Sequence, residues 1–125
     1  MKNLFQAFAR YNGSVNQSVA ELLEPFKKDQ IMMETKAYYP SIFATCFHNF
    51  ISDLNGLRRY RDALKENKAL NSGKLLSLEE KSLRAEFESD YKRFFQYRKQ
   101  VDELIIQFVN ELDEHQMNST IRYKN

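Results

Sequence analysis

Tryptophan is absent from this 125-residue chain, which has only one cysteine, two prolines and three glycines. A lone Cys46 cannot form an internal disulfide, which excludes the small secreted domains that disulfides hold together. Scarce glycine and proline argue against a β-sandwich or barrel, which needs a turn every 8–12 residues or so. No stretch approaches the roughly 18 apolar residues of a membrane span, and the N-terminus lacks the apolar run of a signal peptide. We therefore expect a helical, cytoplasmic protein that does not enter membranes.

Composition places the chain among ordinary globular domains. Hydrophobic residues make up 42% and charged residues 29%, close to the globular averages of about 45–50% and 25%. At this length the chain fits one domain, spanning residues 1–125. The 19 Lys and Arg against 17 Asp and Glu leave a net charge of +2, well below that of a dedicated nucleic-acid binder. No nucleic-acid partner is expected.

A first helix is predicted over residues 4–23. Its apolar residues recur every three or four positions, the spacing of one helix face: Leu4, Phe8, Tyr11, Val15, Val19 and Leu22. Pro25 biases Glu24 away from helical geometry and should end this helix. Residues 26–39 are predicted to be a connection with one short turn at most.

A second helix is predicted from Pro40, which suits a first helical turn, to about Leu64. At about 100° per residue, one sector of this helix faces the core: Phe43, Phe47, Phe50, Leu54 and Leu57. The opposite side carries small or hydrogen-bonding residues: Ser41, Ala44, Thr45, His48, Ser52, Asn55 and Arg59.

The last third of the chain begins with a predicted loop over residues 65–77. Ser77 and Glu80 match a capping box that would start the next helix. Another apolar face follows: Phe87, Tyr91, Phe94, Val101, Ile105, Phe108 and Leu112. A helix over residues 78–112 would be unusually long, so we expect a break near residues 82–89. Three long amphipathic helices, each with an apolar face to bury, predict an all-α helical bundle.

His48 is the candidate metal ligand. Its small, polar neighbours on the helix leave space for an ion and its waters. The alternative is a histidine that is simply solvated or hydrogen-bonded. Asp53 lies about 140° around the helix from His48 and does not share its face, whereas Glu21 and Glu24 would add carboxylates only if the first helix packs beside it.

His115, Cys46 and two segments that mix cations with aromatics are weaker candidates. His115 follows the last strong apolar position and is expected at the surface. Cys46 lies about 160° from His48 on the helix, so the two residues do not form a catalytic pair. Arg58–Arg61 and Lys92–Lys99 mix cations with aromatics, which is compatible with stacking on single-stranded nucleic acid, but the same mixture arises on any amphipathic helix.

The segment from Ser41 to Arg59, with the pattern Ser-Ile-x-x-Thr-x-x-His and an Asp five positions later, resembles the second helix of DinB-like (DinB/YfiT) four-helix-bundle proteins. Tyr11, Asn12 and Asn16 look like the family's opening motif. Thr120–Asn125 is similar to the extended segment before the family's last helix.

This resemblance implies an up-down bundle that carries a divalent metal, often nickel or zinc, on one histidine of the second helix and two of the last. His48 matches the first of these ligands. The chain ends at Asn125, where the resemblance places the histidine-bearing last helix, so the metal site would be incomplete in one chain or carry no metal at all. The family also implies a small-molecule or thiol substrate for those members that are enzymes.

Two functional hypotheses follow. One is a DinB-like metal-dependent enzyme of the transferase or hydrolase type with an incomplete metal site. The other is a non-catalytic helical module that self-associates, as a homodimer, through the apolar groove that a missing fourth helix leaves open. Whether the chain is an enzyme is left open by its residues.

Overall fold

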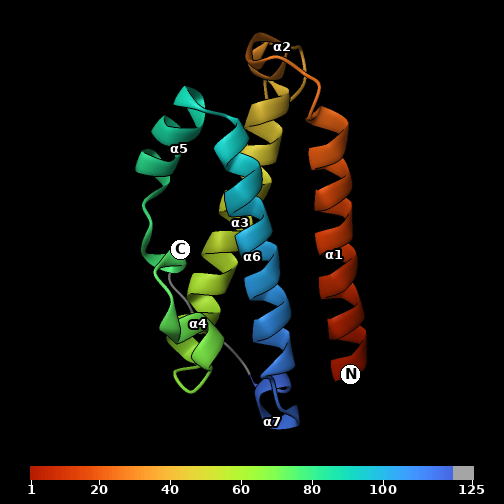
Figure 1. Cartoon of the computed structure of the whole chain (residues 1–125). Coiled ribbons are helices and arrows are strands. Elements are labelled where there is room, and N and C mark those ends of the chain that lie inside the picture. Colours follow the sequence, from red (N-terminus) through yellow and green to blue (C-terminus); the bar gives the residue numbers. More distant parts are fainter. Residues whose placement is uncertain (120–125) are drawn as a thin grey trace.

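The computed structural model describes residues 1–119, which form helices joined by short connections (Figure 1). The helices are α1 (Lys2–Leu23), α2 (Lys28–Met32), α3 (Ile42–Ala63), α4 (Lys68–Ser72), the 3-10 turn η1 (Leu75–Ser77), α5 (Glu80–Ser89), α6 (Lys92–Asn110) and α7 (Glu114–Met117). No strand occurs among these residues, which confirms the all-α class. The DinB-like up-down arrangement stays a prediction, and Thr120–Asn125 lies outside the described residues.

The two first long helices begin and end close to their predicted limits. Helix α1 ends at Leu23, although Glu24 keeps helical backbone angles, φ −50° and ψ −46°. Pro25 therefore follows the end of the helix as predicted, but it does not move the backbone angles of Glu24 out of the helical region. Helix α3 starts directly after Ser41, whose hydroxyl oxygen accepts a hydrogen bond from the Ala44 N–H at 2.9 Å. This N-cap satisfies one of the free N–H groups at the helix start.

The predicted third helix is divided in two. Helix α5 ends at Ser89 and α6 starts at Lys92, so the break falls just beyond the predicted interval. The capping box at Ser77 is wrong, because the Ser77 hydroxyl donates to the Lys74 carbonyl oxygen and α5 begins only at Glu80. The predicted loop over residues 65–77 instead holds α4 and η1.

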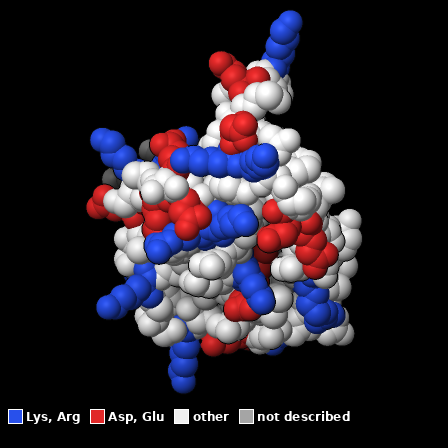
Figure 2. All heavy atoms as spheres, turned by 45° about the horizontal axis from the view of Figure 1, so that its top comes forward, with Lys and Arg blue, Asp and Glu red and all other residues white. Residues whose placement is uncertain are grey.

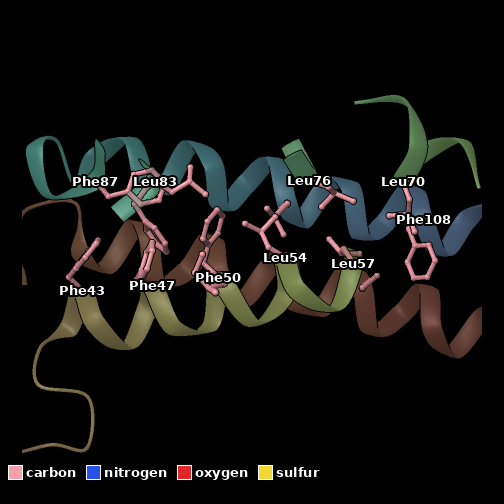
Figure 3. Packing of buried hydrophobic residues seen from close by; sticks show 14 of the residues in the cluster. Phe43, Phe47, Phe50, Leu54, Leu57, Leu70, Leu76, Leu83, Phe87 and Phe108 are labelled. Atoms are coloured by element: carbon pink, nitrogen blue, oxygen red, sulfur yellow. The ribbon is translucent and has the colours of Figure 1, made fainter. Parts of the chain in front are cut away.

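The core lies between α3 and the elements that cover it. Figure 3 shows the apolar side chains of α3 directed toward α5, α6 and η1. All five residues of the predicted sector are buried, and they meet Leu76, Leu83, Phe87 and Phe94. Phenylalanine rings pack edge to face here, for example Phe87 against Phe94 with centroids 5.5 Å apart. The predicted core face of α3 is confirmed.

Helix α1 departs from the prediction. It lies at one edge of the molecule and packs mainly on α6 (Figure 1). Only Ala9 and Leu23 are buried among its residues. Of the six residues of its predicted apolar face, only Val19 is partly buried against the core. Leu4, Phe8, Tyr11, Val15 and Leu22 are exposed, between 41% and 71% of each. The expectation that each long helix buries its apolar face is therefore wrong for α1.

Within residues 1–119, no helix is both long enough and apolar enough to cross a membrane. On the face of the molecule in Figure 2, Lys and Arg side chains are interspersed with Asp and Glu. That face offers no broad region of one charge sign to a polyanion.

Candidate functional site

His48 lies exposed on the outer side of α3. Its ring stacks on Tyr39, which precedes the helix, with centroids 4.4 Å apart and an angle of 24° between the ring planes. Tyr39 in turn meets Tyr38 edge to face. The small-residue strip on which His48 was identified is therefore partly covered by an aromatic side chain from the α2–α3 connection.

The other residues considered for a metal site do not gather around His48. Glu21, Glu24 and His115 are exposed, and Asp53 forms an ion pair with Arg98. Among residues 1–119, no group of three or more His, Cys, Asp or Glu side chains is placed to hold a metal ion. The role of His48 as a metal ligand stays a prediction, which metal analysis of the native chain and of His48→Ala would test.

A buried charged pair on α6 was missed by the sequence analysis. Arg98 and Asp102 lie one helical turn apart and each is 5% exposed. The guanidinium donates from Nε and Nη2 to Asp102 Oδ1, at 3.1 and 2.7 Å. Nη2 also donates to Asp53 Oδ2 of α3 at 2.6 Å. Arg98 therefore joins α6 to α3 by charge-assisted hydrogen bonds.

Helix α1 completes this network with two amides. Asn12 Nδ2 donates to Asp102 Oδ1 at 3.2 Å, and Asn16 Nδ2 donates to both oxygens of Asp102 at 3.1 Å. Gly13 lies between them, and a Cβ atom there would be 3.8 Å from the Asp102 Cβ. The carboxylate thus holds the polar side of α1 against α6. We call Asn12, Asn16, Asp53, Arg98 and Asp102 the polar network.

One signal in the sequence could have located this network. The apolar face of α6 skips from Phe94 to Val101, and the residue that falls on that face within the gap is Arg98. A cation in a core position usually has a buried acidic partner, and Asp102 is one turn away on the same helix. Nothing in the spacing shows that Asn12 and Asn16 would be the neighbours.

The environment of the network changes two pKa values. Burial raises the pKa of Asp102, while the Arg98 charge and hydrogen bonds from Arg98 and Asn16 offset part of that rise. Burial also raises the pKa of the Cys46 thiol, and Arg98 lowers it only in part. Cys46 consequently stays a protonated thiol at neutral pH, a form that is neither a good nucleophile nor a good metal ligand.

A cleft of about 710 Å³ opens beside the network. It lies between the N-terminal half of α1, the C-terminal half of α3, the end of α6 and α7. Its walls are mainly apolar, with a few polar groups: Phe5, Phe8, Ala9, Asn12, Asp53, Gly56, Arg59, Tyr60, Leu64, Ile105, Phe108, Val109, Leu112, Gln116, Met117 and Ser119. Phe8 belongs both to this cleft and to the exposed side of α1.

The exposed apolar side of α1 therefore continues into the cleft. We call Leu4, Phe8, Tyr11, Val15 and Leu22 the α1 stripe. These side chains follow one another along a helix about 33 Å long. Apolar patches of this extent on a soluble protein usually mark an interaction site.

Three arginines of the cationic stretches considered for nucleic-acid stacking make contacts within the fold. Arg58 donates to the carbonyl oxygens of Leu76 and Leu78. Arg93 pairs with Glu86 at 2.9 Å, and Arg98 is buried in the polar network. These arginines connect helices to their neighbours, which does not favour a surface for binding phosphates.

Comparison of the chain with protein-family models, with curated proteins and with solved structures gave no match. The DinB-like resemblance therefore stays a prediction from the segment between Ser41 and Arg59. The features of this chain that bear on its function are the geometry of α1, the cleft and the polar network.

Proposed function

We propose that this protein is a helical interaction module that self-associates through the α1 stripe and the adjoining cleft. The single observation that carries the proposal is the orientation of α1. Its amides, Asn12 and Asn16, turn inward to Asp102, and the residues of the α1 stripe turn outward. An amphipathic helix normally does the opposite in a monomer.

The orientation of α1 has a physical cause that also keeps the stripe outside. Rotating α1 to bury the stripe would remove both amides from the buried carboxylate of Asp102. Asp102 would keep Arg98, but leaving part of a buried charged group without hydrogen bonds costs at least about 1–3 kcal/mol. The stripe is therefore held at the surface by the polar network, and a partner is the remaining way to remove it from water.

The area of the stripe suits a second copy of this chain. From their exposed fractions, the five side chains present about 600 Å² to solvent. A stable interface of standard size buries about 800 Å² on each partner. The neighbouring wall of the cleft, with Phe5 and Tyr60, supplies the rest of such a surface.

Light scattering on the purified chain tests the proposal. At about 100 µM, where association with a micromolar Kd is nearly complete, we expect twice the chain mass of 14.9 kDa. Tyr11→Glu places a charge in the stripe and should give a monomer, because burying an unpaired carboxylate opposes association. Its side chain is 71% exposed, so the fold should be unaffected.

Tyr38→Glu is the matched control. Tyr38 is also an exposed tyrosine, at 92%, but it lies in the α2–α3 connection, away from the stripe. This variant should associate like the unchanged chain. A monomeric unchanged chain, or equal association by both variants, would contradict the proposal.

A further inference from the structure

Helix α1 carries an apolar pattern that is nearly symmetric about its midpoint at Gly13. Leu4 and Leu22 are equally far from this position, as are Tyr11 and Val15, and as are Ala7 and Val19. The remaining large residue on the exposed side, Phe8, corresponds to the small Ser18. Phe5 and Leu23 have Glu21 and Asn3 as counterparts, but they pack against the core and not on the exposed side. Leu4, Tyr11, Val15, Ser18 and Leu22 lie on the same exposed side of the helix at about 100° per residue.

We infer that two copies of this chain pack α1 against α1 in an antiparallel pair, with the twofold axis passing near Gly13. This inference rests on the self-association proposed above and specifies its geometry. A twofold interface brings the same patch of both copies together. Because the apolar positions of α1 are nearly symmetric about Gly13, apolar residues of one copy face apolar residues of the other when the two helices run in opposite directions.

Side-chain sizes favour the antiparallel pair over a parallel one. In the antiparallel pair Phe8 faces Ser18 of the second copy, and Tyr11 faces the smaller Val15. In a parallel pair each residue faces its own copy, which sets Phe8 against Phe8 and Tyr11 against Tyr11. Large residues opposite small ones let two helices approach to the usual 8–10 Å between axes.

The cleft adds a second reason. It opens beside the N-terminal half of α1, at Phe5 and Phe8. An antiparallel partner places the C-terminal half of its own α1 along this half, so Leu22 of the second copy lies near Leu4, next in sequence to Phe5 of the cleft wall. The apolar walls of both clefts then border one continuous interface.

Pairs of single cysteines test this arrangement. In a Cys46→Ala background we would prepare Leu4→Cys and Leu22→Cys separately and treat each, and their mixture, with a short bismaleimide. Positions 4 and 22 are roughly 27 Å apart along one helix. The antiparallel pair therefore predicts a cross-linked dimer in the mixture of the two variants and no cross-linked dimer when either variant is treated alone.

Other outcomes are informative in different ways. Cross-linking of Leu4→Cys alone would show a parallel pair and overturn the inference. A dimer by light scattering without cross-linking in the mixture would also overturn it while leaving the proposed self-association intact, whereas a monomer would remove both. Tyr38→Cys, mixed with either variant, controls for random collision and should not cross-link.

Discussion

At the scale of single residues, the polar network explains why α1 faces the way it does. Removing Arg98 and Asp102 from water is costly, and their mutual attraction alone rarely compensates for that cost. Here Asp53 supplies a second carboxylate to Arg98, and two asparagine amides also donate hydrogen bonds to Asp102. The structure leaves no buried side-chain nitrogen or oxygen without a hydrogen-bond partner among the described residues.

Asn16→Ala should lower the free energy of unfolding by about 1.5–3 kcal/mol, the usual contribution of a hydrogen bond to a charged group. Asn16 donates to both oxygens of Asp102, so its loss leaves part of a buried carboxylate unsatisfied. Urea denaturation followed by circular dichroism measures the change. Gln17→Ala is the control, because Gln17 is exposed and bonds only to Glu21, and it should change stability by less than about 0.5 kcal/mol. Equal effects would contradict the assigned role of Asn16.

The same network predicts a pH dependence. Burial raises the pKa of Asp102, so the folded chain holds this proton at pH values where the unfolded chain has released it. The contribution of Asp102 to stability therefore falls as pH rises from its ordinary pKa through the raised one. Because Asn16 lowers the pKa of Asp102, the destabilisation by Asn16→Ala should be larger above the raised pKa than below it. Denaturation at several pH values measures this, and a destabilisation independent of pH would contradict it.

At the scale of helices, the apolar side predicted from the sequence is the buried side in α3 and α6, but not in α1. In α3 and α6 the apolar residues face a shared core, with Phe50, Phe87 and Phe94 in mutual contact. In α1 the apolar period predicts the helix correctly but not which side is buried. The difference arises because α1 meets α6 at Asp102, where amides are better neighbours than leucines.

Gly56→Ala should raise the free energy of unfolding by about 0.5–1 kcal/mol, the usual difference between Gly and Ala within a helix. Gly56 lies inside α3 on the wall of the cleft, and a Cβ atom there would meet nothing within 4 Å. Thermal or urea denaturation measures the gain. Lower stability would show that the added methyl group meets a neighbouring atom and would contradict this prediction.

At the scale of the whole molecule, α1 is attached at one edge and carries the apolar surface that the core does not use. Its contact with α6 is held by the polar network and by a hydrogen bond from Gln6 to Asn110 at 2.9 Å. A monomer with this arrangement leaves apolar surface exposed to water, and association with a second copy would cover that surface.

Self-association should make the apparent Tm depend on protein concentration. Mass action stabilises a folded dimer relative to unfolded chains as concentration rises. We expect the Tm of the unchanged chain to increase over a hundredfold range of concentration, and the Tm of Tyr11→Glu to stay constant. Scanning calorimetry or fluorescence measures both. A Tm of the unchanged chain that does not vary with concentration would count against the dimer.

Much of the fold was predictable because it depends on local spacing. The limits of α1 and the end of α3 follow from apolar periodicity and from Pro25. Helix α3 starts after an N-cap at Ser41 and not at Pro40 as predicted. Short elements such as α4 and η1 were missed, since a single helical turn has too few residues to show a period. The polar network was missed because its members come from three helices, and Asn12 and Asp102 are 90 residues apart.

The sequence by itself determined that this chain is helical and which sides of α3 and α6 form the core, because periodicity is a property of neighbouring residues. Only the tertiary structure decided that α1 would turn its amides inward and Leu4, Phe8, Tyr11 and Leu22 outward. That choice depends on where α6 places the charge of Asp102. A buried carboxylate must be hydrogen-bonded, and this requirement exceeded the tendency of α1 to bury its apolar side.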